Sequence, residues 1–229
     1  MLWLSDQTWT AIILTIKLAS ITTVFLLLIG IPIALWLARS KSYLSEIVAT
    51  IIAIPLVLPP TVLGFYLLVL MAPNGFLSFI APIFSLEKFA FTFQGLVIGS
   101  IVYSLPFVVQ PIRNSFETMG VRPLEVAATL RISPFHAFWR VTLPITSPGI
   151  VTAAILGFAH TVGEYGVVQM IGGNLPGQTA VISTTIMSYV EADKMLEANI
   201  LSVMMIVFSF IIILAVRLLQ KFYNGVSYD

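Results

Sequence analysis

The sequence predicts an all-α integral membrane protein with about five transmembrane helices. Of its 229 residues, 59% are hydrophobic and only 9% are charged, whereas soluble proteins carry about 25% charged residues. Five apolar segments are long enough to cross a bilayer, which takes about 20 residues in a helix. Cysteine is absent, so disulfides and thiolate metal sites are excluded. We expect one transmembrane domain over residues 1–229, with its core at about residues 9–220.

The five expected spans follow one another along the chain. They cover about residues 9–37, 47–71, 92–112, 148–171 and 198–219. The first is too long for the apolar part of a cleaved signal peptide, so we expect it to remain in the protein. Residues 76–91 are amphipathic and predict an interfacial segment. Gly95 and Gly99 in the third span, and Ala153 and Gly157 in the fourth, have the spacing that allows close helix contact.

A water-exposed stretch lies between the third and fourth spans. Residues 124–144 are the longest passage without a membrane-length apolar run, within a loop that we place at residues 113–147. Pro123 and Glu125 suit the start of a helix over residues 124–130, because proline fits the first turn and a carboxylate is favoured near the positive end of the helix dipole.

A second short helix is expected to follow in the same loop. Ser133 and Pro134 predict an N-cap and a first helical residue, and the helix should continue past Trp139 until Pro144 interrupts it. The stretch therefore predicts a helical hairpin outside the bilayer that suits docking to another protein. An amphipathic surface hairpin without a partner is the alternative.

The basic residues are distributed unevenly between the two sides. Eight of them fall in connections that would share one side: Arg39, Lys41, Arg113, Arg122, Arg131, Arg140, Arg217 and Lys221. Lys88 and Lys194 fall on the other side, and Lys17 lies in the first span. The positive-inside rule then predicts an external N-terminus, a cytoplasmic C-terminus and a cytoplasmic hairpin. No basic stripe is present, which argues against nucleic acid as a partner.

Three prolines interrupt the second span. Pro55, Pro59 and Pro60 remove backbone donors and disfavour helix before each ring, so the helix should break near its middle. The half-helix restarting at Pro60 would offer its free amides and the Thr61 hydroxyl to an anion on a translocation path. A simple proline kink packed against neighbouring helices explains the same residues.

A carboxylate lies within the fourth span, in Gly163-Glu164-Tyr165-Gly166. An ionisable residue at this depth is a candidate functional group. Glu164 would repel an oxyanion, so we expect it to pair with His160 or Lys17 or to hold a gate, with Gly163 and Gly166 allowing close backbone approach. The alternative is a carboxylate that reaches the outer interface and only forms hydrogen bonds.

Motifs for catalysis are missing from the sequence. It contains no GxxxxGK[ST] phosphate loop and no HExxH or GxSxG motif. We therefore expect no catalytic residues, metal site or cofactor, and energy for any transport would come from a partner.

The hairpin resembles the cytoplasmic loop of ABC-importer permeases, whose pattern is Glu-Ala-Ala, three residues, Gly, nine residues, Ile-x-Leu-Pro. This sequence departs from the pattern at Val126, Arg131 and Val141. Because the family's glycine supplies a positive φ that arginine adopts at a cost, we expect residues 132–134 to make the turn. The family loop inserts into a cleft on an ATPase subunit, so the resemblance implies coupling contacts from these residues: Glu125, Ala127, Ala128, Leu130, Arg131, Val141, Leu143 and Pro144.

The resemblance extends over nearly the whole chain. PLVLPPTVLGFYLLVLM, RPLEVAATLRISPFHAFWRVTLPITSPG and HTVGEYGVVQMIGGNLPGQT look like the permease subunits of molybdate ABC importers, in the oxyanion branch shared with sulfate permeases. This implies a type I importer permease fold with a cytoplasmic coupling helix, embedded in membrane lipid. It also implies a homodimer with two ATPase subunits and an external binding protein that delivers molybdate or tungstate. A sulfate or thiosulfate permease and a membrane scaffold without a transport role are the alternatives.

Overall fold

The computed structural model describes residues 5–225, and these residues form helices and turns with no strand. Within them, four helical runs are long and apolar enough to cross a membrane, and the number reaches five if one bent pair counts as a span. The elements in chain order are α1 (Asp6–Arg39), α2 (Tyr43–Ala53), the 3-10 helix η1 (Ile54–Leu56), α3 (Pro60–Met71), the 3-10 helix η2 (Phe76–Phe84), α4 (Phe93–Met119), α5 (Arg122–Thr129), α6 (Pro134–Ala137), the π-helical turn η3 (Phe138–Thr142), α7 (Leu143–Gly163), α8 (Gly166–Gly172), α9 (Ile182–Glu191) and α10 (Met195–Gly225). The predicted all-α class is confirmed.

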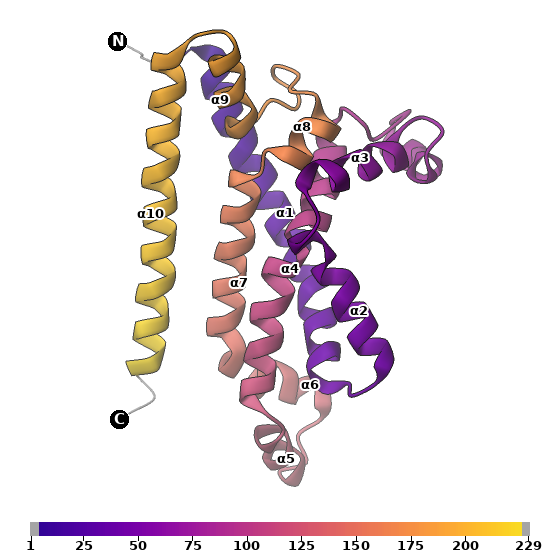
Figure 1. Cartoon of the computed structure of the whole chain (residues 1–229). Helices are drawn as coiled ribbons and strands as arrows, with labels where there is room; N and C mark the ends of the chain where they lie inside the picture. Colours follow the sequence, from indigo (N-terminus) through magenta and orange to yellow (C-terminus); the bar gives the residue numbers. More distant parts are fainter. Residues whose placement is uncertain (1–4, 226–229) are drawn as a thin grey trace.

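The centre of the molecule is formed by α1, α4 and α7, which lie side by side (Figure 1). Small residues let these helices approach closely: a Cβ on Gly157 of α7 would lie 2.6 Å from a methyl carbon of Val108 on α4. Helix α10 lies along one edge of the bundle and contacts only α9 and α7 extensively. Most of its large apolar side chains are exposed and available to lipid or to a partner.

The two ends of the bundle differ in charge. The C-terminal ends of α1, α4 and α10 lie at one end together with α5 and α6, and the start of α1 and α9 lie at the other (Figure 1). Each of the eight basic residues that the sequence assigns to the cytoplasm belongs to the first group of elements or to its connections. In Figure 1 the hairpin with α5 lies at the bottom of the bundle, whereas α3 and the turn that follows it lie in the upper half.

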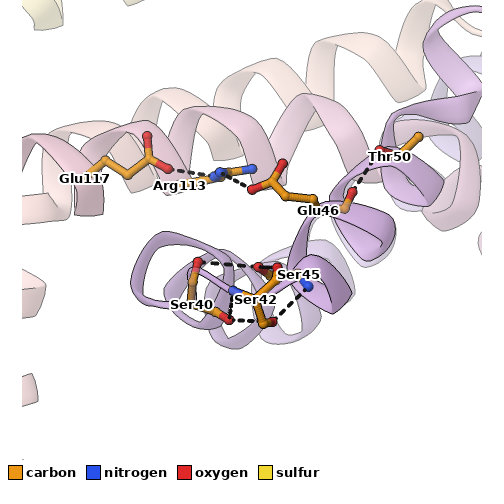
Figure 2. A network of polar contacts seen from close by, with 7 residues as sticks. All are labelled: Ser40, Ser42, Ser45, Glu46, Thr50, Arg113 and Glu117. Carbon is orange, nitrogen blue, oxygen red and sulfur yellow. Dashed lines mark hydrogen bonds and ion pairs between the residues drawn. The ribbon is translucent and has the colours of Figure 1, made fainter.

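Helix α4 continues to Met119, seven residues beyond the end of the span that the sequence predicts at residue 112. The Arg113 side chain is neutralised by Glu117 one turn later, at 2.7 Å, and by Glu46 of α2, at 3.6 Å (Figure 2). This network lets the helix leave the apolar region without an isolated charge and joins α4 to α2. Gly120, with φ of 66°, ends the helix.

The second predicted span is a bent pair of helices, which forms either a broken span or a re-entrant loop. The helix breaks where the prolines predict, and α3 restarts at Pro60 after the extended residue Pro59. The axis of α3 is bent by 109° from that of α2 and η1, so α3 points sideways from the bundle in Figure 1.

Pro144 does not interrupt the second arm of the hairpin, which corrects the prediction from sequence. Residues Pro134–Gly163 form one continuous helical run. The Leu143 amide donates to the Phe138 carbonyl, five residues earlier, in the π-helical turn η3. Pro144 then occupies the first turn of α7, where proline is tolerated.

The fourth span is shorter than predicted. Helix α7 ends at Gly163, and Glu164 is extended, with φ of −72° and ψ of 129°. Helix α8 begins at Gly166 and ends at Gly172. Glu164 is therefore placed in a break between two helices and not inside a regular span.

Candidate coupling surface and translocation path

The first arm of the hairpin is α5, which begins as the sequence predicts, with Glu125 in its first turn. Its end differs from the prediction, because Arg131 itself has a positive φ of 53°. The Arg131 amide donates to the Ala128 carbonyl at 2.9 Å, and the Ile132 amide donates to the Ala127 carbonyl at 3.0 Å. These two bonds define a Schellman motif. Arginine thus makes the turn that we had assigned to residues 132–134.

The second arm begins at the predicted N-cap. The Ser133 hydroxyl accepts the His136 amide at 3.5 Å and lies 2.7 Å from His136 Nδ1. Pro134 follows as the first residue of α6. Local chemistry therefore sets both helix starts in the hairpin.

The residues predicted to couple to an ATPase fall into two groups. Ala127 is buried, and Val141 and Leu143 are half-buried, so these three hold the hairpin against the bundle. The remaining five are exposed: Glu125, Ala128, Leu130, Arg131 and Pro144. Only the exposed group is free to contact a partner.

The hairpin carries an apolar patch of four residues, of which the sequence predicted only Leu130 as a contact residue. Val126 and Leu130 on α5, and Phe135 and Trp139 on the second arm, are 59%, 68%, 69% and 53% exposed. We call these four residues the hairpin patch. Each arm contributes a pair spaced by four residues, and this spacing was the signal in the sequence. Exposed aromatic and aliphatic side chains beyond the membrane-crossing bundle are typical of a protein interface.

The two predicted parts of the translocation path meet in the structure. A Cβ on Gly166, at the start of α8, would lie 2.6 Å from Cβ of Pro60, at the start of α3. A Cβ on Gly64 would lie 2.8 Å from Met170 Cβ. Helices α3 and α8 therefore pack backbone to backbone through two glycines. We call this place the α3–α8 junction.

The side chains at the α3–α8 junction differ in exposure. Pro59 and Thr61 are exposed at the start of α3, and Gly163 is exposed at the end of α7. Glu164 is only 6% exposed. The uncharged predicted residues thus remain accessible while the carboxylate is buried.

Glu164 caps α8. Its Oε1 accepts the amide of Val167 at 2.7 Å, and its backbone carbonyl accepts the Ser183 hydroxyl at 2.5 Å. Neither His160 nor Lys17 forms the predicted ion pair: the two ion pairs among the described residues both involve Arg113. A buried carboxylate on a helix N-terminus is stabilised by the free amides and the helix dipole, which explains why no basic partner is needed.

His160 is held by α4. Its Nδ1 lies 3.0 Å from the Ser104 hydroxyl, and its ring stacks on Phe107 with centroids 3.8 Å apart. Tyr103 lies between the two groups, 4.8 Å from the His160 ring and next to the Glu164 side chain. Sequence reasoning missed Tyr103, Ser104 and Ser183, because their partners lie far away along the chain.

Comparison with known proteins identifies the family. The pattern of the binding-protein-dependent transport system inner membrane component matches residues 30–224, most of the chain. The chain belongs to this family. The family is described as an inner membrane component, which agrees with the membrane-length helices described above.

Relatives of this transport component include proteins named for molybdenum. The molybdenum transport system permease protein ModB of Azotobacter vinelandii is 52% identical over 98% of this chain and 99% of its own length. The proteins of the same name from Escherichia coli K12 and Mycobacterium tuberculosis H37Rv are both 34% identical, over 82% and 90% of this chain and 82% and 78% of theirs.

Two solved structures have the same fold. A bacterial ABC transporter involved in alginate import has a TM-score of 0.73 at 19% identity, covering 96% of this chain and 81% of its own. The MetNI methionine ABC transporter, in inward-facing conformations, has a TM-score of 0.70 at 18% identity, covering 95% and 99%. The chain therefore has the predicted fold of type I ABC-importer permeases.

Proposed function

We propose that this chain is the permease subunit of an ATP-driven importer that carries molybdate across the cytoplasmic membrane. The permease role rests on one observation above all, the hairpin patch held at the basic end of the bundle. The choice of molybdate is supported by the names of the relatives, above all the one with 52% identity. The chain itself is a transport subunit and not an enzyme.

In this proposal the hairpin is the part of the permease that contacts the ATPase subunit. Two ATPase subunits would bind two copies of the chain, with Glu125, Ala128, Leu130, Arg131 and Pro144 at the contact beside the hairpin patch. The basic end would then face the cytoplasm, as the positive-inside rule requires, and the start of α1 would lie outside. A binding protein would deliver the anion at that outer end.

The α3–α8 junction supplies the path or gate. Irregular backbone inside a membrane protein is tolerated where it is buried or lines a water-filled cavity. Pro59, Pro60, Thr61 and the glycines Gly163 and Gly166 would line the route of the anion with backbone and a hydroxyl. Glu164 would hold α8 in place, and its burial keeps its charge from an oxyanion.

Uptake of labelled molybdate into vesicles tests the proposal. The vesicles would contain the permease with its ATPase and its binding protein, and unlabelled anions would compete. We expect molybdate to compete at far lower concentration than sulfate, and uptake to require ATP. Equal competition by sulfate would favour a sulfate permease, and a chain that forms no ATPase complex would favour a scaffold.

Glu125→Arg tests the coupling surface. The substitution reverses the charge of an exposed side chain in the first turn of α5, so it should weaken co-purification of the ATPase at least tenfold while the permease stays folded. Glu87→Arg, an exposed glutamate beyond η2, is the matched control and should change nothing. Normal ATPase binding and uptake in Glu125→Arg would contradict the assigned contact.

A further inference from the structure

Two cavities adjoin at the C-terminal end of α1. The first, of about 390 Å³, lies between α1, α5 and the second arm of the hairpin. The second, of about 520 Å³, lies between α1, α5 and the end of α4. Both are lined by Arg39, Leu124 and Ala128. We call the two together the α1–α5 groove, because these shared residues make them parts of one surface.

The groove carries positive charge that the protein does not neutralise. Arg39 and Lys41 are exposed, and neither forms an ion pair with the described part of the chain. Two carboxylates also line the second cavity: Glu117 is paired with Arg113, and the exposed Glu125 offsets one of the two basic side chains, which leaves one net positive charge. An anionic group at Arg39 and Lys41 would complement this end of the groove.

A polar group without a partner lines the first cavity. The hydroxyl of Thr142 is fully buried, and no hydrogen-bond partner for it exists among the described residues. Buried hydroxyls are nearly always paired, and this one has no accessible surface, so a ligand oxygen in the cavity would pair with it once the side chains that cover it move apart. Thr142 ends the π-helical turn, and such turns are frequent at functional sites.

The rest of the lining selects the class of ligand. Leu35, Ile132 and Phe138 make most of the first cavity apolar, together with alanine and proline side chains. A free oxyanion would lose its hydration there without enough hydrogen bonds in return. Trp36 and Tyr43 are exposed on either side of Arg39, as aromatic residues are at a membrane interface. The lining therefore suits a molecule with one anionic end and one apolar end.

We propose that the α1–α5 groove binds an anionic phospholipid. Its phosphate contacts Arg39 and Lys41, its glycerol or ester oxygens accept from Thr142, and an acyl chain follows the apolar lining. The inference needs only that the chain is embedded in a membrane, so it stands apart from the proposed transport of molybdate. A lipid at this place would contact the inward face of α5 while the hairpin patch faces the partner.

Lipid-dependent unfolding of the purified full-length chain tests the proposal. The chain in detergent is titrated with phosphatidylglycerol or with phosphatidylcholine, and its melting temperature is followed, because a ligand of the folded state raises it. We expect phosphatidylglycerol to raise the melting temperature more than phosphatidylcholine. The double substitution Arg39→Gln with Lys41→Gln should weaken the apparent affinity about tenfold, since it removes charge-assisted hydrogen bonds.

The matched control removes two positive charges from α10, at the same end of the bundle as the groove. Arg217→Gln with Lys221→Gln lies on exposed positions of α10 and should leave the preference for phosphatidylglycerol intact. Equal loss in both double variants would show a diffuse surface attraction and overturn the site. Displacement of the lipid by molybdate or inorganic phosphate at equal concentration would show a free-anion site and also overturn it.

Thr142→Val provides a second readout. Without lipid, the variant should be at least as stable as the natural chain, because the hydroxyl it removes has no partner in the protein. With phosphatidylglycerol, its affinity should fall severalfold. Loss of stability without lipid, or unchanged affinity with it, would overturn the role of Thr142.

Discussion

The backbone at single residues limits which side chains the two sites accept. Arg131 holds the left-handed conformation that ends α5, where most L-residues are strained. Gly166 lies against Pro60, where any side chain would collide with the ring. One residue is thus disfavoured by its conformation, and the other is required by the space around it.

Arg131→Gly should stabilise the hairpin. Glycine adopts a positive φ without steric cost, so the free energy of unfolding should rise by about 0.5–1 kcal/mol. Thermal unfolding in detergent measures the change. Arg131→Ala is the control, because it removes the same charge but keeps the strain. An equal gain in both variants would assign the effect to charge and contradict the conformational explanation.

Gly166→Ala should loosen the α3–α8 junction. The added Cβ would lie 2.6 Å from Pro60 Cβ, and neither ring nor backbone can yield easily. We expect a loss of about 1–3 kcal/mol in the free energy of unfolding, as for other overpacked sites. Gly163→Ala is the matched control, because no atom lies within 4 Å of its added Cβ. Similar losses in both variants would argue against the close contact.

At the scale of elements, α8 depends on a side chain just before it. Glu164 supplies the acceptor for Val167, whose amide is otherwise buried at the start of the helix. The carboxylate therefore connects the end of α7 to the start of α8. It does so without any basic residue.

Glu164→Ala should destabilise this connection more than Glu164→Gln. Alanine leaves the Val167 amide without an acceptor, which costs about 1–3 kcal/mol, whereas glutamine retains a carbonyl oxygen. Denaturant unfolding of both variants in detergent would measure the difference. If glutamine and alanine were equally harmful, the charge and not the cap would be the important property.

Helix starts could be predicted from sequence because they depend on neighbouring residues. Pro60 and the pair Ser133 and Pro134 begin helices where local capping rules place them. The places where helices continue were harder to predict, because they depend on a distant contact or on an irregular turn. Arg113 is tolerated within α4 because Glu46 of another helix pairs with it, and Pro144 is tolerated because a π-helical turn precedes it.

The candidate sites could be predicted only where they depend on neighbouring residues. The hairpin and the path residues follow from patterns within short segments. The contact of Pro60 with Gly166, and the position of Tyr103 beside Glu164, join residues from separate helices. No spacing along the chain encodes such contacts.

At the scale of the whole molecule, the fold gathers eight of the eleven basic residues at one end of the bundle. The hairpin and the C-terminal ends of α1, α4 and α10 share one end (Figure 1). This separation makes the orientation in the membrane directly testable. The absence of cysteine from the sequence means that each introduced thiol is unique.

Thiol labelling in cells should find the two ends on opposite sides. Asn74→Cys, after α3, should react with a reagent that cannot cross the membrane, because we expect that end outside. Thr129→Cys, at the end of α5, should react only after the membrane is opened. Reaction of both thiols in intact cells, or the reverse pattern, would contradict the proposed orientation.

The unbroken passage through Pro144 has a mechanical consequence. The run from Pro134 to Gly163 contains 30 residues, which corresponds to about 45 Å of helix. In the proposed importer it would act as one rigid rod between the ATPase contact on the hairpin and the break at Glu164, which would serve as the hinge. We expect a tilt of the hairpin to rotate the whole run and so to move Glu164, because helical structure continues through the π-helical turn η3.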